Sequence, residues 1–109
     1  MKRGEIVIVS APGDYGKPRP AVVVQTNGIP ENYPSIIVCQ ITSTIEAVTD
    51  FRIIVEPSER NGLRARSQIM TDKIIAVNQR RIGQRIGSLG EAELRQLNAA
   101  LLFVLGLTD

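Results

Sequence analysis

The sequence predicts a mainly β protein: a small, strongly bent antiparallel sheet or barrel with one C-terminal helix. Short runs rich in valine and isoleucine alternate with clusters of Gly, Pro, Asn and Asp, which is typical of strands and their turns. Helical periodicity is confined to the last part of the chain, so the strand–helix–strand alternation of a parallel sheet is missing. A chain of 109 residues supports one compact core, and we expect a single domain over residues 1–109.

Each expected strand is an apolar or β-branched run that ends at turn residues. Glu5–Val9 stops at Ser10-Ala11-Pro12-Gly13, and Ser35–Thr42 follows a long connection that contains two prolines. Thr71-Asp72 separates two apolar halves, and glycines mark bends in the last run. The strands are expected at Glu5–Val9, 21–25, Ser35–Thr42, 51–55, 68–70 with 73–77, and 80–89.

The C-terminal segment has the pattern of one amphipathic helix. Ser88 and Glu91 have the spacing of a capping box, in which each side chain satisfies a free backbone N–H at the helix start. Four leucines then recur at helical spacing and predict a face that packs on the sheet. They are Leu94, Leu97, Leu101 and Leu105. Gly106 is expected to end the helix, because glycine readily adopts the left-handed conformation found there.

Composition describes an ordinary globular protein, since 43% of the residues are hydrophobic and 22% are charged. Cys39 is the single cysteine; it lies in an apolar run and is expected in the core, without a disulfide. The chain has no histidine, the usual zinc ligand and proton carrier, so catalysis must use other groups. Few aromatic residues leave an aliphatic core, and a homodimer would cover the remaining apolar surface.

Neither end of the sequence suggests a membrane segment. The longest apolar stretch near the C-terminus, 99–105, is far shorter than the roughly 20 residues that a spanning helix needs. Met1-Lys2-Arg3 is followed at once by Gly4-Glu5 and only a short apolar run, unlike a secretory signal. We therefore expect a cytoplasmic protein with no membrane partner.

Positive charge is concentrated in one section of the chain. The whole sequence has a net charge of +2, whereas residues 59–85 contain seven Arg or Lys side chains against two carboxylates. This section fits a polyanion such as a nucleic acid, and it fits equally a solvated face with scattered cations.

Two short motifs place groups suited to phosphate near the ends of expected strands. Arg19 lies between Pro18 and Pro20, which restrict its backbone, so its planar guanidinium could be aimed at a phosphodiester. Thr42 and Ser43 end an apolar strand, and their hydroxyls could donate to phosphate oxygens. The alternatives are an exposed arginine on an ordinary proline loop and hydroxyls that cap a turn.

A third cluster of polar groups lies between residues 62 and 73. Arg64 and Arg66 are two residues apart, so strand alternation would place both on one face. Asp72 stands beside Lys73. This pair could be an orienting ion pair, a general base next to a cation, or a surface pair worth under about 1 kcal/mol.

In their order along the chain, these motifs resemble the MazF/PemK toxin family. That family begins with an arginine-glycine-acid strand, and a glycine-containing loop then leads into Arg-Pro and a run of valines. The resemblance reaches the leucine-rich final helix, so it spans nearly the whole chain. The residues that carry it are Arg3-Gly4-Glu5, Arg19-Pro20-Ala21-Val22-Val23-Val24, Gln40-Ile41-Thr42-Ser43, Asn61-Gly62-Leu63 and Ser67-Gln68-Ile69-Met70-Thr71-Asp72-Lys73-Ile74.

The resemblance implies an SH3-like barrel of the PemK/CcdB type, a homodimer that is the toxin of a type II toxin-antitoxin system. The implied activity is sequence-specific, metal-independent cleavage of single-stranded RNA without a cofactor. In it the 2′-hydroxyl of the RNA attacks the adjacent phosphate and leaves a 2′,3′-cyclic phosphate and a 5′-hydroxyl. The implied protein partner is a cognate antitoxin whose acidic, disordered segment occupies the RNA groove.

The resemblance also implies roles for individual residues. Arg19 corresponds to the arginine that acts on the scissile phosphate and Thr42 to the hydroxyl that bonds the same phosphate, so we expect both to be catalytic. Asp72 matches the acidic position of the family and is a candidate general base. The residues expected to bind RNA are Tyr15, Lys17, Ser43, Arg64, Arg66, Gln68 and Lys73.

The chain departs from relatives at three points. Met70 stands where several PemK-type members have an arginine, and Lys73 stands where many have glutamine. Some relatives use a loop histidine, which this sequence lacks. The proton-transfer chemistry of those members therefore does not carry over unchanged.

Two other functions compete with RNA cleavage. A gyrase poison similar to CcdB would share the fold but would need no phosphate-directed Arg19 beside the Thr42 hydroxyl. A noncatalytic RNA-binding barrel would bind RNA without cutting it, and its binding would survive Arg19→Ala.

Overall fold

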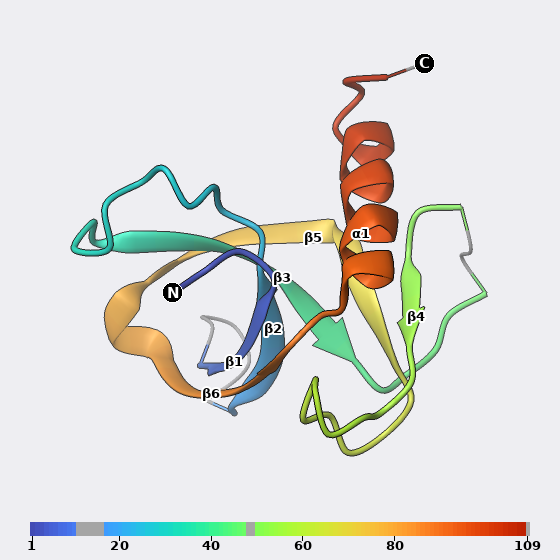
Figure 1. Cartoon of the computed structure of the whole chain (residues 1–109), viewed down its shortest axis with the longest axis horizontal. Coiled ribbons are helices and arrows are strands. Elements are labelled where there is room, and N and C mark those ends of the chain that lie inside the picture. The colour runs from blue at the N-terminus through green and yellow to red at the C-terminus, as the bar shows by residue number, and fades with distance from the viewer. Residues whose placement is uncertain (11–16, 48–49, 109) are drawn as a thin grey trace.

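The computed structural model describes residues 1–10, 17–47 and 50–108. In these ranges it contains one six-stranded sheet in the order β4-β5-β3-β2-β1-β6, and every neighbouring pair is antiparallel. The expected mainly β class with a C-terminal helix is confirmed (Figure 1). The elements are β1 (Glu5–Val9), β2 (Arg19–Val23), β3 (Ser35–Thr42), β4 (Ile53–Val55), β5 (Ser67–Asn78), η1 (Gln79–Arg81), β6 (Ile82–Ser88) and α1 (Glu91–Val104).

The central strands are buried on both faces, which explains their nearly continuous apolar runs. On one face, Ile6 pairs with Val22 and Val22 with Cys39, and this layer packs against α1. On the other face, Val7 pairs with Ala21 in a second apolar cluster. Side chains alternate between the two faces of a strand, so two buried faces require apolar residues at successive positions.

Cys39 lies in the first of these layers with its side chain fully buried, which confirms its expected place in the core. Burial raises the pKa of the Cys39 thiol to about 12. The thiol is therefore protonated at neutral pH and acts as a small apolar side chain.

The strand boundaries differ from the predicted ones where tertiary partners intervene. The stretches 68–70 and 73–77 belong to a single strand, β5, because β3 supplies backbone partners on both sides of Thr71-Asp72. The register of the β3–β5 pair shifts between Cys39 and Ile41, and this shift accommodates the extra residues of β5 around Thr71-Asp72. The last strand begins at Ile82 rather than at residue 80, since residues 79–81 form a 3₁₀ turn.

Helix α1 begins two residues later than the predicted capping box. Ser88 is the last residue of β6, where it pairs with Glu5, so it is unable to cap the helix. Gly90 takes the N-cap position, and the Glu93 carboxylate accepts a hydrogen bond from the Gly90 N–H at 3.0 Å. This is the acidic half of a capping box.

The C-terminal end of α1 partly confirms the prediction. Gly106 has a φ of +71°, its N–H donates to the Phe103 carbonyl, and the Leu107 N–H donates to the Leu102 carbonyl. This is the glycine stop that was expected. Leu97 is fully buried, but Leu105 is 56% exposed, so its predicted packing on the sheet is wrong. Leu105 lies after the helix end, beyond the part of α1 that contacts the core.

Two glycines bring the distant edges of the sheet together. The segment after β4 reaches β6, where the Ser88 N–H donates to the Arg60 carbonyl at 2.9 Å. Gly62 has a φ of +70°, and a Cβ at this position would overlap the carbonyl of Ile86. A Cβ on Gly87 would overlap the backbone of residues 60 and 61. Glycine at both positions therefore allows the sheet to curl into a barrel-like shape.

Among the described residues, the helix of this fold falls short of the length and apolar character needed to cross a membrane.

Candidate functional site

A pocket of about 460 Å³ lies at one end of the curled sheet. It is bounded by the start of β2, the end of β3, the segment that follows Gly62, and β6. Its described lining residues are Ile8, Arg19, Pro20, Ile41, Thr42, Ser43, Gly62, Leu63, Arg64, Ala65, Ser67, Gln84 and Ile86.

Strand register brings Arg19 and Thr42 to this pocket. In the β2–β3 pair Ala21 lies opposite Gln40 and Val22 opposite Cys39. Continuing this antiparallel register by two residues places Arg19 opposite Thr42. Arg19 is also anchored by pairing with Val9 of β1. The arginine and the strand-end hydroxyl therefore meet, although 22 residues separate them in the sequence.

The floor of the pocket is apolar. Pro20 pairs with Ile8 of β1, and the same β2–β3 register places it opposite Ile41. Leu63 and Ile86 add apolar side chains on the far wall. An apolar floor with a polar rim suits a nucleotide, because its base or sugar can pack on the apolar floor while its charged phosphate meets the polar rim.

The rim is positively charged and rich in hydroxyl groups. Arg19 and Arg64 contribute two guanidinium groups, and the described lining contains no carboxylate. The Thr42 Oγ1 accepts a hydrogen bond from the Thr44 N–H at 3.1 Å, so the turn orients the hydroxyl oxygen. A hydroxyl that accepts one hydrogen bond can still donate its own proton. This geometry favours binding of an anion.

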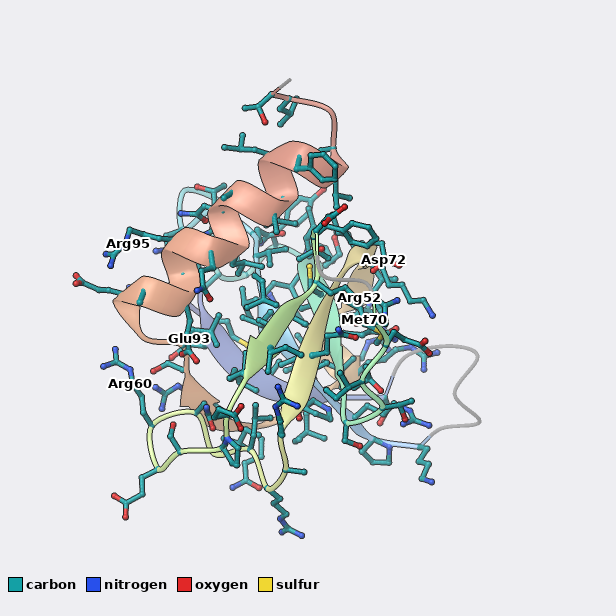
Figure 2. The ribbon with its side chains drawn as sticks, turned by 90° about the vertical axis from the view of Figure 1, so that its right-hand side faces the viewer. Arg52, Arg60, Met70, Asp72, Glu93 and Arg95 are labelled. Carbon is teal, nitrogen blue, oxygen red and sulfur yellow. The ribbon has the colours of Figure 1, made fainter. Side chains whose placement is uncertain are left out.

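Asp72 lies outside the described lining of the pocket. Arg52 binds both of its carboxylate oxygens, with Nε to Oδ1 at 2.8 Å and Nη2 to Oδ2 at 3.0 Å. Figure 2 shows the two side chains side by side. The hydrogen bond from Arg52 holds the pKa of Asp72 below its ordinary value, which makes this carboxylate a weak base.

Gln68 is also away from the surface of the pocket. Its side chain is almost completely buried, and its Nε2 donates to the Glu46 carbonyl at 2.9 Å. Its Oε1 accepts from the Glu46 N–H and from Arg52, each at 3.2 Å. The side-chain amide that was expected to contact a ligand is used inside the fold.

The other residues expected to bind RNA are dispersed around the pocket. Ser43 and Arg64 line it. Lys17 is exposed just before β2, and Lys73 is exposed on β5. Arg66 is exposed and forms an ion pair with Glu56 at 2.9 Å. Tyr15 lies outside the described residues.

The far wall of the pocket consists of Leu63, Gln84 and Ile86, none of which was predicted from the sequence as a site residue. These side chains reach the site only because the sheet curls and brings β6 next to the segment after Gly62. The Asn61-Gly62 pair was a local signal for the turn. Asn61 is buried, and its Oδ1 accepts from the Ser58 and Leu63 N–H groups at 3.0 and 2.9 Å.

A family model and a known relative both place this chain among toxins of one family. The family of PemK-like, MazF-like toxins of type II toxin-antitoxin systems matches residues 2–105. A probable endoribonuclease MazF from Mycolicibacterium smegmatis is 34% identical over 108 residues, which is 98% of each chain.

Solved structures share the fold at lower identity. An endoribonuclease in complex with its cognate antitoxin from a mycobacterial species has a TM-score of 0.84 at 20% identity, covering 100% of this chain and 98% of that one. The Mycobacterium tuberculosis toxin MazF-mt6 has a TM-score of 0.82 at 21% identity, covering 96% and 99%. The family match covers nearly the whole chain, so this protein belongs to the PemK-like, MazF-like toxin family of type II toxin-antitoxin systems.

Proposed function

We propose that this toxin is an endoribonuclease that cuts single-stranded RNA at the pocket formed by the ends of β2 and β3. The observation that carries the proposal is the meeting of Arg19 and Thr42 on one positively charged rim. The relative from Mycolicibacterium smegmatis, described as a probable endoribonuclease, supports the same activity. A gyrase poison would have no need of this phosphate-directed pair.

The reaction is a transesterification within the RNA. The 2′-oxygen forms a bond to the adjacent phosphorus, the bond from phosphorus to the 5′-oxygen breaks, and the products carry a 2′,3′-cyclic phosphate and a 5′-hydroxyl. The attacking hydroxyl loses a proton and the leaving oxygen gains one. Because DNA has no 2′-hydroxyl, DNA of the same sequence resists cleavage.

Arg19 and Thr42 act on the charge that develops at the phosphorus. The Arg19 guanidinium binds the nonbridging oxygens and stabilises their added negative charge in the transition state. The Thr42 hydroxyl, oriented by the Thr44 N–H, donates to one of the same oxygens. Both groups come from side chains of the protein, and a chelator would leave them unaffected.

The wider RNA path follows the cations around the pocket. Ser43 and Arg64 on the rim contact the nucleotides nearest the cut. The flanking backbone phosphates meet the exposed Lys17, Arg66 and Lys73. A homodimer extends this path across two subunits. A cognate antitoxin occupies the path in the inhibited state. The proposed compartment is the cytoplasm, where cellular RNA is found.

The test is cleavage of a long single-stranded RNA and of the matching DNA by purified protein in EDTA. Arg19→Ala and Thr42→Val are each expected to lower kcat by about 100- to 1000-fold, the usual cost of removing one donor to a transition-state oxyanion. Mapping of the ends would show the cyclic phosphate. Arg85→Gln is the matched control: Arg85 pairs with Glu5 at 2.6 Å, and its loss is expected to leave the rate unchanged.

Three outcomes would contradict the proposal. RNA binding without cleavage by the wild type would support a noncatalytic binding module. Equal cleavage rates for the wild type and Arg19→Ala would mean that the catalytic site lies elsewhere in the protein. Inhibition of gyrase without any RNA cleavage would support the CcdB-like alternative.

A further inference from the structure

Three polar side chains hold the loop after β3 against the sheet. We call Arg52, Gln68 and Asp72 the loop clamp. They come from the residue before β4 and from two positions of β5. The segment that they hold, residues 43–47, begins at the rim of the pocket with Ser43.

Gln68 fastens this segment directly. Its side-chain amide bonds both the N–H and the carbonyl of Glu46, at 3.2 and 2.9 Å. A two-point contact of this kind fixes the backbone of Glu46 on both sides of its Cα. Because Gln68 is 1% exposed, water has little access to replace either bond.

Arg52 fastens Gln68. Its Nη1 donates to Gln68 Oε1 at 3.2 Å, and its side chain is only 9% exposed. A cation with so little access to water needs a partner, and Asp72 supplies one with two hydrogen bonds. Asp72 therefore holds Arg52 in place, and Arg52 holds Gln68. Gln68 in turn holds the backbone of Glu46.

Strand pairing places the loop clamp next to the pocket. Gln68 pairs directly with Thr42 in the β3–β5 ladder. The residue that holds Glu46 is thus the cross-strand neighbour of the hydroxyl residue on the rim. Movement of residues 43–47 would also disturb the Thr44 N–H, which orients the Thr42 hydroxyl.

We infer that Asp72 and Arg52 are positioning residues for RNA cleavage, acting through Gln68 to keep Thr42 and Ser43 aligned with Arg19. This inference rests on the proposed function and deepens it. In this inference Asp72, the acidic residue of β5, positions the protein's own loop of residues 43–47. Both oxygens of its carboxylate bind Arg52, and it lies outside the described lining of the pocket.

A double-mutant cycle of Asp72→Asn, Arg52→Gln and the double variant tests the inference. Each single variant is expected to lower kcat by about tenfold with little change in KM, because the phosphate-binding groups are misplaced. The double variant should be no slower than the worse single one, since both changes break the same support. The shape of the pH profile of kcat should remain that of the wild type.

Amide hydrogen exchange of Glu46, measured by NMR, gives a readout that needs no RNA. The Glu46 N–H donates to Gln68, so each clamp variant is expected to speed its exchange by about tenfold. Arg85→Gln is again the control and should leave this exchange unchanged, because the Arg85–Glu5 pair joins β6 to β1.

The outcomes separate this inference from the proposed function. If Asp72 were the general base, Asp72→Asn would remove a limb of the pH profile and cost far more than Arg52→Gln, which would overturn the inference. Faster Glu46 exchange with unchanged cleavage would also overturn it. If the wild type cuts no RNA, the proposed function fails, while the Glu46 exchange still reports whether the clamp holds the loop.

Discussion

Asp72 shows how much a single partner changes the chemistry of a residue. In the sequence it stands beside Lys73, and its carboxylate could serve as a base or as half of an ion pair. In the structure Arg52 binds both oxygens and lowers the pKa of the carboxyl, so the charged form is favoured. A carboxylate stabilised in this way supports structure better than it accepts protons.

The same pairing predicts a pH dependence of stability. A lowered pKa in the folded state contributes stability above the ordinary pKa of 3.8, and this stability is lost as the pH falls through the folded value. Urea unfolding of the wild type from about pH 6 to about pH 2 should therefore show a steeper loss of stability below about pH 4 than unfolding of Asp72→Asn. Parallel curves for the two proteins would show that the pair adds nothing to stability.

At the scale of single elements, the leucines of α1 show that helical spacing in the sequence does not by itself ensure burial in the structure. Leu97 and Leu105 belong to the same predicted face, and both follow helical spacing. Leu97 is fully buried against the sheet, whereas Leu105 lies at the C-cap and is 56% exposed. Periodicity identifies the side of a helix that faces the core, and the extent of the sheet decides how far along the helix that face is covered.

This difference predicts unequal costs of the same substitution. Leu97→Ala is expected to lower the free energy of unfolding by about 2–5 kcal/mol, because it removes a side chain from a packed core. Leu105→Ala should change it by less than about 0.5 kcal/mol. Urea denaturation of the two variants measures both values, and equal costs would mean that Leu105 is packed in solution.

At the scale of the whole molecule, curling of the sheet creates the pocket. The segment after β4 comes against β6, and Gly62 and Gly87 allow the backbones to approach closely. Leu63 and Arg64 thereby face the end of β3, where Thr42 lies. Without this approach Leu63 and Ile86 would stay near opposite edges of the sheet.

Two glycines with nearly the same positive φ provide a matched test of this closure. Gly106→Ala should cost about 1 kcal/mol, since a Cβ there meets nothing and only the left-handed backbone is disfavoured. Gly62→Ala should cost more than about 3 kcal/mol, because its Cβ would also overlap the Ile86 carbonyl. Comparable thermal and urea stabilities of the two variants would contradict a tight closure at Gly62.

Neighbouring residues account for the local features: the β-branched runs that form strands, the glycine that stops the helix, and the positions of Arg19 and Thr42 near strand ends. These features depend on residues close together in the chain, where turn chemistry and side-chain alternation act. The sequence also indicated the toxin family, through the order of short motifs.

The meeting of distant groups, by contrast, follows from long-range packing. This packing joined 68–70 and 73–77 into one strand, brought Ile86 to the pocket, and paired Asp72 with Arg52. Gln68 changed from an expected RNA contact to an internal support for Glu46. These outcomes depend on sheet closure and on competition among polar partners far apart in the chain, and local periodicity contains no information about either.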